Sequence, residues 1–211
     1  MAVVIQKIVG NRYGDYFYPS ISGVAQSMNY YPFSKMQPEE GIASIALGFG
    51  KSVMEGEKIL RFSPRFRQIV LQRSTVDNIL TNSQRFFYAL KMRTPARAMG
   101  IHSDETLSKR NVTDAVDEHP VQLCSSSYVH AEHRIRDSFS PTDYPVVTFA
   151  SILKYNALPL AEMINALLSL GQKKLDCPVE LGFALDIPTN PEKKAKLAIF
   201  SQPDRAGHQL P

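Results

Sequence analysis

The stretch "GIASIALGFGKSVMEG", Gly41–Gly56, decides how the rest of the chain is interpreted. Its apolar run Ile42–Leu47 predicts a buried strand, and a turn containing Gly48, Gly50 and Lys51 follows it before one short helical turn. Glycine turns let backbone N–H groups approach a phosphate, and a lysine beside them adds positive charge. Because such turns serve plain packing more often, this pattern alone is a weak signal for a nucleotide site.

The remaining hydrophobic patterns predict several more strands and one long amphipathic helix, Leu158–Leu175, which begins near Pro159. A shorter helix over 75–82 has Ser74 as its expected N-cap. Residues 91–120 carry few apolar positions and are expected to be a surface excursion. The strands are expected at Ala2–Val9, Tyr16–Ser27 (bent, or two short strands), Lys58–Phe62, Val121–Arg136, Val146–Ile152, Val179–Leu185 and Leu197–Phe200. Many strands with few helices indicate an α+β fold with a mainly antiparallel sheet.

Composition limits the class of protein. With 211 residues, 44% of them hydrophobic, the chain has enough apolar material for one domain with a real core. Cys124 and Cys177 lie far apart without metal-ligand spacing, so both are expected to be packing residues of a reduced, cytoplasmic protein. No window reaches the roughly 18 apolar residues that a membrane span needs.

Basic residues are concentrated between Arg61 and Arg97, where eight of them accompany the single acid Asp77. A solvated face, or a surface that meets an acidic neighbouring domain, is the favoured interpretation, and phosphate contact is the alternative. The aromatic residues of this stretch allow a third hypothesis, a nucleic-acid surface, although their apolar neighbours favour a core position for Phe86 and Phe87.

Four ordered motifs together resemble one family. "VVIQKIVG", "SGVAQS", "ALGFGKSVMEG" and "PVELGFAL" are similar, in order and approximate spacing, to the PEP/pyruvate-binding (ATP-grasp) domain of phosphoenolpyruvate synthase and pyruvate phosphate dikinase. The stretches "YPSISGVAQSMNYYP" and "GIASIALGFGKSVMEGEKILRFSP" resemble most closely the PEP-synthase-like proteins of Bacteroidetes-type bacteria. The resemblance covers nearly all of residues 1–211 and implies a single partial domain, the C-terminal lobe of an ATP-grasp fold.

The resemblance also implies which residues bind ATP. The first motif would read the adenine edge through its backbone, the second would run under the nucleotide, and the third would supply the glycine turn. An ordinary core strand is the alternative for the first motif, and it would point Gln6 into water. An acidic residue is common in the synthases where this chain has Lys51, so Lys51 does not inherit that role. The implied cofactor-binding residues are Gln6, Lys7, Ile8, Ser22, Gly23, Gly48, Gly50 and Lys51.

The resemblance implies a magnesium site near the end of the chain. In the family, carboxylates on one strand and a glutamine on its hairpin partner hold Mg²⁺ on the ATP phosphates, and an arginine takes phosphate charge; hard oxygen ligands suit this ion. Here Glu180 and Gln202 would be the metal ligands and Arg205 the catalytic residue. Gly182 stands where the family has a second carboxylate, and Arg205 is out of step with the family's Gln–x–Arg–Pro pattern.

The implied function is the ATP-binding portion of a phosphoenolpyruvate synthase-like phosphotransferase that is not active alone. Its expected partners are the nucleotide, the preceding ATP-grasp lobe and a phosphohistidine domain of a longer parent protein, with no membrane. The alternative is a non-catalytic interaction or regulatory module that keeps the fold, as Gly182 would allow. A metal site at His130 and His133 is disfavoured, because a strand would send residues three apart to opposite faces.

Overall fold

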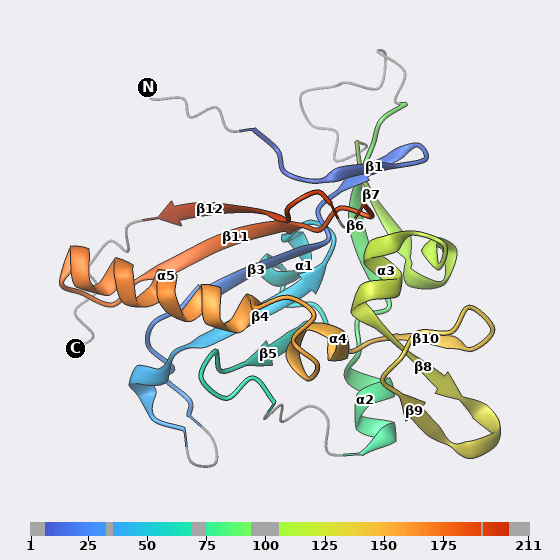
Figure 1. The fold of residues 1–211 in the computed structure, drawn as a ribbon, viewed down its shortest axis with the longest axis horizontal. Coiled ribbons are helices and arrows are strands. Elements are labelled where there is room, and N and C mark those ends of the chain that lie inside the picture. The colour runs from blue at the N-terminus through green and yellow to red at the C-terminus, as the bar shows by residue number, and fades with distance from the viewer. Residues whose placement is uncertain (1–6, 33–35, 69–74, 94–105, 191, 203–211) are drawn as a thin grey trace.

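A computed structural model describes residues 7–32, 36–68, 75–93, 106–190 and 192–202 of the chain, with Ser201 and Gln202 described by their backbone. It confirms an α+β class in which every strand pairing in the described part is antiparallel. The strands form a five-stranded sheet ordered β12-β11-β3-β4-β5, a four-stranded sheet ordered β1-β2-β6-β7, and a three-stranded sheet ordered β10-β8-β9 (Figure 1).

The elements are short except for one helix. The strands are β1 Asn11–Tyr13, β2 Tyr16–Tyr18, β3 Ile21–Gln26, β4 Ile42–Leu47, β5 Leu60–Phe62, β6 Phe86–Lys91, β7 Leu107–Asn111, β8 Ser125–Val129, β9 Arg134–Arg136, β10 Tyr144–Val147, β11 Glu180–Asp186 and β12 Lys196–Gln202. The α-helices are α1 Lys51–Met54, α2 Val76–Asn82, α3 His119–Cys124, α4 Ala150–Leu153 and α5 Leu160–Leu175. Short 3-10 turns occur at Pro38–Glu40, Val112–Ala115 and His130–Glu132.

The five-stranded sheet has two faces of different composition. Successive residues of a strand point to opposite faces, so residues directly opposite in register share a face. One face carries the large apolar side chains of the core: Ile21, Ala25, Ala43, Ile45, Leu47, Phe62, Phe183 and Leu185. The other face carries mainly small side chains: Ser22, Val24, Ser44, Ala46, Gly182 and Ala184. The large side chains therefore pack inward, and the small ones leave room above the opposite face.

Helix α5 covers the core face of this sheet. Its buried positions Leu160, Ala161, Ile164 and Leu168 recur at helical spacing, which is the amphipathic pattern predicted from sequence. In Figure 1, α5 runs along the near face of the sheet and α1 lies behind it. Pro159 is the N-cap, and Asp176 ends the helix in a left-handed conformation.

A partly buried ion pair joins the four-stranded sheet to α3. Arg110 of β7 donates two hydrogen bonds from Nη1 to the Glu118 carboxylate, at 2.9 and 3.0 Å, and the hydroxyl of Tyr18 donates to the same carboxylate. The side chains of Arg110 and Glu118 are only 10% and 18% exposed, and the guanidinium lies 4.0 Å from the ring centroid of Tyr16. Burial, followed by the contact with Glu118, raises the pKa of Tyr18, so its hydroxyl stays a hydrogen-bond donor.

A second polar contact joins two sheets. The amide nitrogen of Asn11 in β1 donates to both carboxylate oxygens of Asp186 in β11, at 2.9 Å each. Asp186 is buried, and burial raises its carboxyl pKa above the ordinary value, although Lys196 and Asn11 oppose the increase. The contact aligns the end of β11 with the first strand of the neighbouring sheet.

Several expectations from the sequence are wrong. Residues 121–124 belong to helix α3 rather than to a strand. The strand expected at Val146–Ile152 ends at Val147, because Phe149 takes a left-handed conformation and helix α4 begins at Ala150. Residues 106–120 are not a surface excursion, because β7 pairs with β6 and Val112 and Ala115 are buried. Lys7–Gly10 have no regular strand structure, and the rest of the expected strand Ala2–Val9 lies outside the described residues.

Two smaller expectations also differ from the structure. Thr75 is the N-cap of α2, because its side chain accepts a hydrogen bond from the backbone N–H of Asn78 at 3.2 Å; Ser74 lies outside the described residues. Cys124 is a buried packing residue as expected, whereas Cys177 is exposed. Among the described residues, none of the helices combines the length and apolar character needed to cross a membrane.

Replacing Glu118 by Gln is expected to lower the free energy of unfolding by about 2–3 kcal/mol, because it leaves the Arg110 charge buried without its partner. Urea denaturation followed by circular dichroism measures the change. The matched control is Glu132→Gln, which removes a carboxylate from the exposed Arg136–Glu132 pair (2.7 Å). That control is expected to cost less than about 0.5 kcal/mol, and equal effects of the two substitutions would contradict a structural role for the buried pair.

Candidate functional site

A cavity of about 450 Å³ lies above the small-residue face of the five-stranded sheet. Its floor is formed by Ser22–Val24 of β3 and Gly182–Ala184 of β11. Lys7–Val9 line one side, and residues of the Phe49–Met54 segment line another. Pockets of a few hundred cubic ångströms or more are of the size that binds small molecules and cofactors.

The lining is mostly apolar. Phe49, Val53 and Met54 come from the turn and helix after β4, and Phe200 comes from β12. Ile8 and Met54 are 53% and 79% exposed, although both side chains are apolar. Exposed apolar side chains around a hollow are typical of ligand-binding or partner-binding surfaces.

Backbone geometry explains why Gly23 occupies the floor of the cavity. A Cβ atom at this position would lie 2.5 Å from Cζ of Phe183 and 2.5 Å from the carbonyl oxygen of Ser44. The Phe183 ring therefore lies against Gly23 on the core face of the sheet, where Gly23 and Phe183 are opposite in register. The glycine is required by core packing, while its backbone lines the cavity on the other side.

The two glycines of the "GFGK" turn have different roles. Gly48 has a φ of +79°, and a Cβ there would lie 2.7 Å from the carbonyl oxygen of Tyr88 in β6. The N–H of Phe49 donates to that same oxygen at 3.0 Å, so this part of the turn packs against β6. Gly50 lines the cavity, and the nearest atom to a Cβ built there is Cβ of Ser22 at 3.6 Å.

Lys51 does not line the cavity. Its Nζ lies 3.6 Å from the Glu55 carboxylate and 5.1 Å from the ring centroid of Tyr88. These contacts hold the lysine on the side of α1 that faces β6. A lysine beside a glycine turn is therefore explained here by an ion pair and an aromatic contact.

The two residues predicted as metal ligands lie directly opposite each other in the sheet. Glu180 of β11 pairs with Gln202 of β12, and Gln26 of β3 pairs with Glu180 on its other side. The amide nitrogen of Gln26 donates to the Glu180 carboxylate at 2.6 Å. The next position on the same face is Gly182, about 7 Å along the strand, which belongs to the cavity floor.

The donor set around Glu180 fits a magnesium ion that is bound mainly through a nucleotide. Mg²⁺ usually keeps several waters and takes one or two protein carboxylates together with substrate phosphates. Glu180 can supply one exposed carboxylate, whereas Gly182 supplies none. In the part of the chain that the structure describes, no three His, Cys, Asp or Glu residues are grouped as metal ligands.

Sequence reasoning missed Asp186 as part of this face. It lies six residues after Glu180 on the same strand, hence on the same face and at the opposite end of the cavity floor. The period of two in "ELGFALD" was the available signal, since it places the acids at both ends of the strand on one side. Both Asp186 oxygens accept hydrogen bonds from Asn11, which makes the residue a structural contact.

The structure brings together five of the residues predicted to bind a cofactor. Lys7, Ile8, Ser22, Gly23 and Gly50 line a single cavity. Gly48 and Lys51 lie beside it without lining it, and their contacts are with β6. Gln6 and Arg205 lie outside the described residues.

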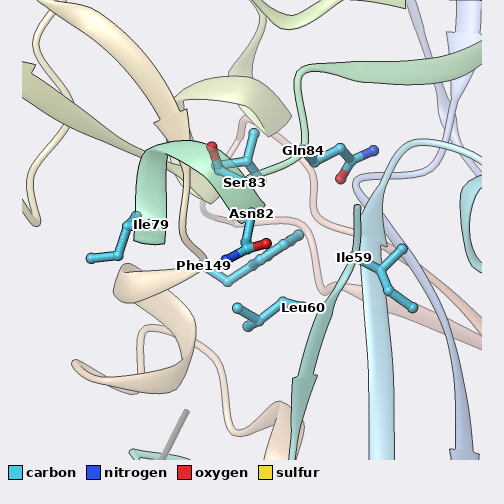
Figure 2. A pocket seen from close by; sticks show the side chains of 8 residues that line it. Ile59, Leu60, Ile79, Asn82, Ser83, Gln84 and Phe149 are labelled. Carbon is cyan, nitrogen blue, oxygen red and sulfur yellow. The ribbon is translucent and has the colours of Figure 1, made fainter. Parts of the chain in front are cut away.

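A second, much smaller cavity lies between α2, β5 and the turn before α4. Figure 2 shows the residues around it: Ile59, Leu60, Ile79, Asn82, Ser83, Gln84 and Phe149. Its volume is about 20 Å³, which is room for about one water molecule. The buried Gln84 amide has its own partners, because it accepts from the N–H of Leu47 at 2.9 Å and donates to the Leu47 carbonyl at 3.1 Å. This cavity is a packing gap of the fold.

The basic stretch 61–97 gives a mixed result. Phe62 and Phe87 are fully buried and Tyr88 is 7% exposed, whereas Phe66 and Phe86 are 37% and 44% exposed. The expectation that Phe86 belongs to the core is therefore wrong. Phe86 is the first residue of β6 and is exposed, whereas the next three residues of the strand are buried; its ring lies 5.4 Å from Nζ of Lys109.

His130 and His133 do not lie in a strand. His130 begins a 3-10 turn and His133 caps its end in a left-handed conformation; both rings contact Tyr128, with centroids 4.5 and 5.9 Å away. Nδ1 of His133 is 2.9 Å from the Tyr128 hydroxyl, and its Nε2 is 3.5 Å from a carboxylate oxygen of Asp77. The geometric reason given for rejecting a metal site is therefore wrong, since the two rings share one neighbour.

Comparisons with protein-family models, with curated proteins and with solved structures found no match for this chain.

Replacing Gly48 by Ala is expected to lower the free energy of unfolding by about 3 kcal/mol, from a strained backbone and from overlap with the Tyr88 carbonyl oxygen. Gly56→Ala is the matched control, because Gly56 also has a positive φ (+67°) but a Cβ there has nothing within 4 Å. The control is expected to cost about 1 kcal/mol. Chemical denaturation of both variants measures the difference, and equal losses would refute packing against β6 as the reason for Gly48.

Proposed function

We propose that this chain is the nucleotide-binding portion of a phosphoenolpyruvate synthase-like phosphotransferase and has the fold of an ATP-grasp C-terminal lobe. One observation carries the proposal. Five residues that the family resemblance assigns to the nucleotide, drawn from three separate stretches of sequence, line one cavity of about 450 Å³. Core packing against Phe183 accounts for Gly23, but it gives no reason for the other four residues to meet at the same hollow.

In this proposal the cavity binds the purine. Its apolar lining, from Ile8, Val53, Met54 and Phe200, suits the faces of a flat ring. The segment Lys7–Val9 has no regular secondary structure, and its backbone N–H and C=O groups are the candidates for hydrogen bonds to the ring edge. Such groups give orientation, while the apolar contacts give most of the affinity.

The phosphate end of the nucleotide would point along β11 toward Glu180. This residue and Gln202 would hold the Mg²⁺ of a bound Mg-ATP, whose phosphate oxygens and waters complete the ion's coordination. The bound ion would neutralise charge on the phosphates during transfer. Arg205 is the proposed phosphate contact, and the phosphorylated histidine would belong to another part of a larger protein.

A second candidate function is a non-catalytic module with the same fold. Gly182 favours it, because a glycine at the centre of the sheet row between Val24 and Phe200 provides no ligand atom from a side chain. Such a module would bind a partner across the same face without metal-dependent phosphate contacts. The two candidates differ in whether Mg-ATP binds and whether a restored carboxylate improves its binding.

Gly182→Glu is expected to strengthen Mg-ATP binding about tenfold if the first function is correct, because it restores a second carboxylate beside Glu180. A Cβ there would lie 3.3 Å from the Phe200 carbonyl oxygen and 3.6 Å from the Phe200 Cβ, so the substitution requires β12 to shift by a few tenths of an ångström. Isothermal titration calorimetry with and without Mg²⁺ measures it, and Gly182→Gln is the control of equal size without charge. If neither the natural chain nor any variant binds Mg-ATP, the non-catalytic module is supported.

Gly50→Phe is expected to abolish nucleotide binding while the chain stays folded. Its φ of −65° accepts any side chain, and a side chain there would occupy the cavity beside Ser22. Thr189→Phe, which adds the same ring at an exposed position of the β11–β12 turn, is the control. Thermal unfolding checks the fold of both variants. Unchanged nucleotide affinity in Gly50→Phe would place the binding site elsewhere.

A further inference from the structure

A groove of about 790 Å³ runs between strand β9 and the end of helix α4, away from the nucleotide cavity. Its lining includes Arg134, Ile135 and Arg136 of β9, Asp137 after it, and Lys154 and Tyr155 on the α4 side. None of these residues belongs to the proposed nucleotide site. Figure 1 shows β8 and β9 as a hairpin at the outer end of the three-stranded sheet.

The groove follows the edge of a strand. The sheet order β10-β8-β9 places β9 at an edge, so one side of its backbone lies beyond the sheet. Arg134 and Arg136 point to one face and Ile135 to the other, yet all three line the groove. The groove therefore runs beside the backbone of β9 rather than over one face, and edge backbone groups are templates for pairing with another extended segment.

The lining is cationic and already binds carboxylates of this chain. It contains three basic residues and one acid. The single acid, Asp137, accepts hydrogen bonds from Nζ of Lys154 and, at 2.8 Å, from the hydroxyl of Tyr155. Arg136 donates to the Glu132 carboxylate at 2.7 Å. These contacts show that the basic and hydroxyl groups of the groove donate hydrogen bonds to carboxylates.

Arg134 is available to pair with a carboxylate of another molecule. It is exposed, and the described part of the chain gives it no ion pair. Arg134 and Arg136 are two residues apart, about 6.7 Å along the strand, which matches the spacing of alternate side chains in an extended peptide. An arginine guanidinium group binds a carboxylate through two parallel hydrogen bonds, a bidentate geometry that also fixes the register of the bound segment.

We propose that this groove binds an acidic peptide segment in extended conformation, added as a strand to the free edge of β9. Main-chain hydrogen bonds along β9 would supply affinity, and acidic side chains at alternate positions would pair with Arg134 and Arg136. The segment belongs to a partner protein. The nucleotide cavity takes no part in this interaction.

The experiment is fluorescence anisotropy of the natural chain with a fluorescein-labelled peptide that alternates glutamate with valine. Binding is expected to weaken with added salt and to be lost when lysine replaces glutamate. The double variant Arg134→Ser with Arg136→Ser is expected to bind about tenfold more weakly. The control, Lys173→Ser with Lys174→Ser, removes the same charge from exposed positions of α5 and is expected to bind normally.

Main-chain pairing is tested separately. One peptide is N-methylated at every glutamate and a second at every valine, so that each lacks the N–H groups along one edge of the extended peptide. Only the peptide that lacks the edge facing β9 is expected to lose binding. Amide resonances of residues 134–136 are expected to shift on addition of the unmodified peptide. Equal binding by all three peptides, or displacement of the peptide by millimolar inorganic phosphate, would overturn the proposal and indicate a small-anion site. Equal weakening by the two serine double variants, or no binding at all, would also overturn it.

Discussion

The contact between Phe183 and Gly23 governs the main sheet. The ring of Phe183 lies where a side chain at Gly23 would otherwise be, so β3 and β11 fit together in one register only. A slip of one residue would exchange the two faces of β11 and put its large apolar side chains on the wrong side. The core face, the small-residue face and the cavity above it all follow from this alignment.

The division between the two faces also sets what the cavity can do. Core residues such as Leu185 and Ile45 are fully buried on one face, and their strand neighbours Ala184 and Ala46 are short. The short side chains leave the hollow, and the Phe49–Met54 segment and Lys7–Val9 form its walls. The proposed purine site and the Glu180–Gln202 row thus lie on the same face of one sheet.

Local sequence predicted those elements whose pattern is independent of the rest of the chain. Ile42–Leu47 was predicted with both bounds, because an apolar run ends at glycines; the pattern of α5 and the β11–β12 hairpin were equally clear. The helix His119–Cys124 was missed, since its strand-like residues fold as a helix in a tertiary setting that buries Val121 and Cys124. The structure of residues 106–120 was not predicted, because β7 is polar and has no apolar alternation. Its Arg110 is stabilised instead by an ion pair with Glu118, which no hydrophobic pattern indicates.

The candidate site could be predicted in part. Motif order pointed to Ser22, Gly23 and Gly50, which line the cavity, but it also pointed to Gly48, whose conformation is set by packing on β6. A glycine in a sequence pattern signals a close approach of two groups without saying whether the second group is a ligand or another strand. The predicted β11–β12 hairpin is consistent with Glu180 lying opposite Gln202. That this pair lies outside the lining of the cavity could be seen only in the structure.

The positions of the two cysteines have a practical consequence. Cys124 is fully buried and Cys177 is exposed, just after the left-handed residue that ends α5 and three residues before β11 begins. A maleimide dye would therefore attach at one place, next to the strand that carries Glu180. The folded chain offers a single chemical handle for an optical reporter at that edge of the sheet, with no engineered residue required.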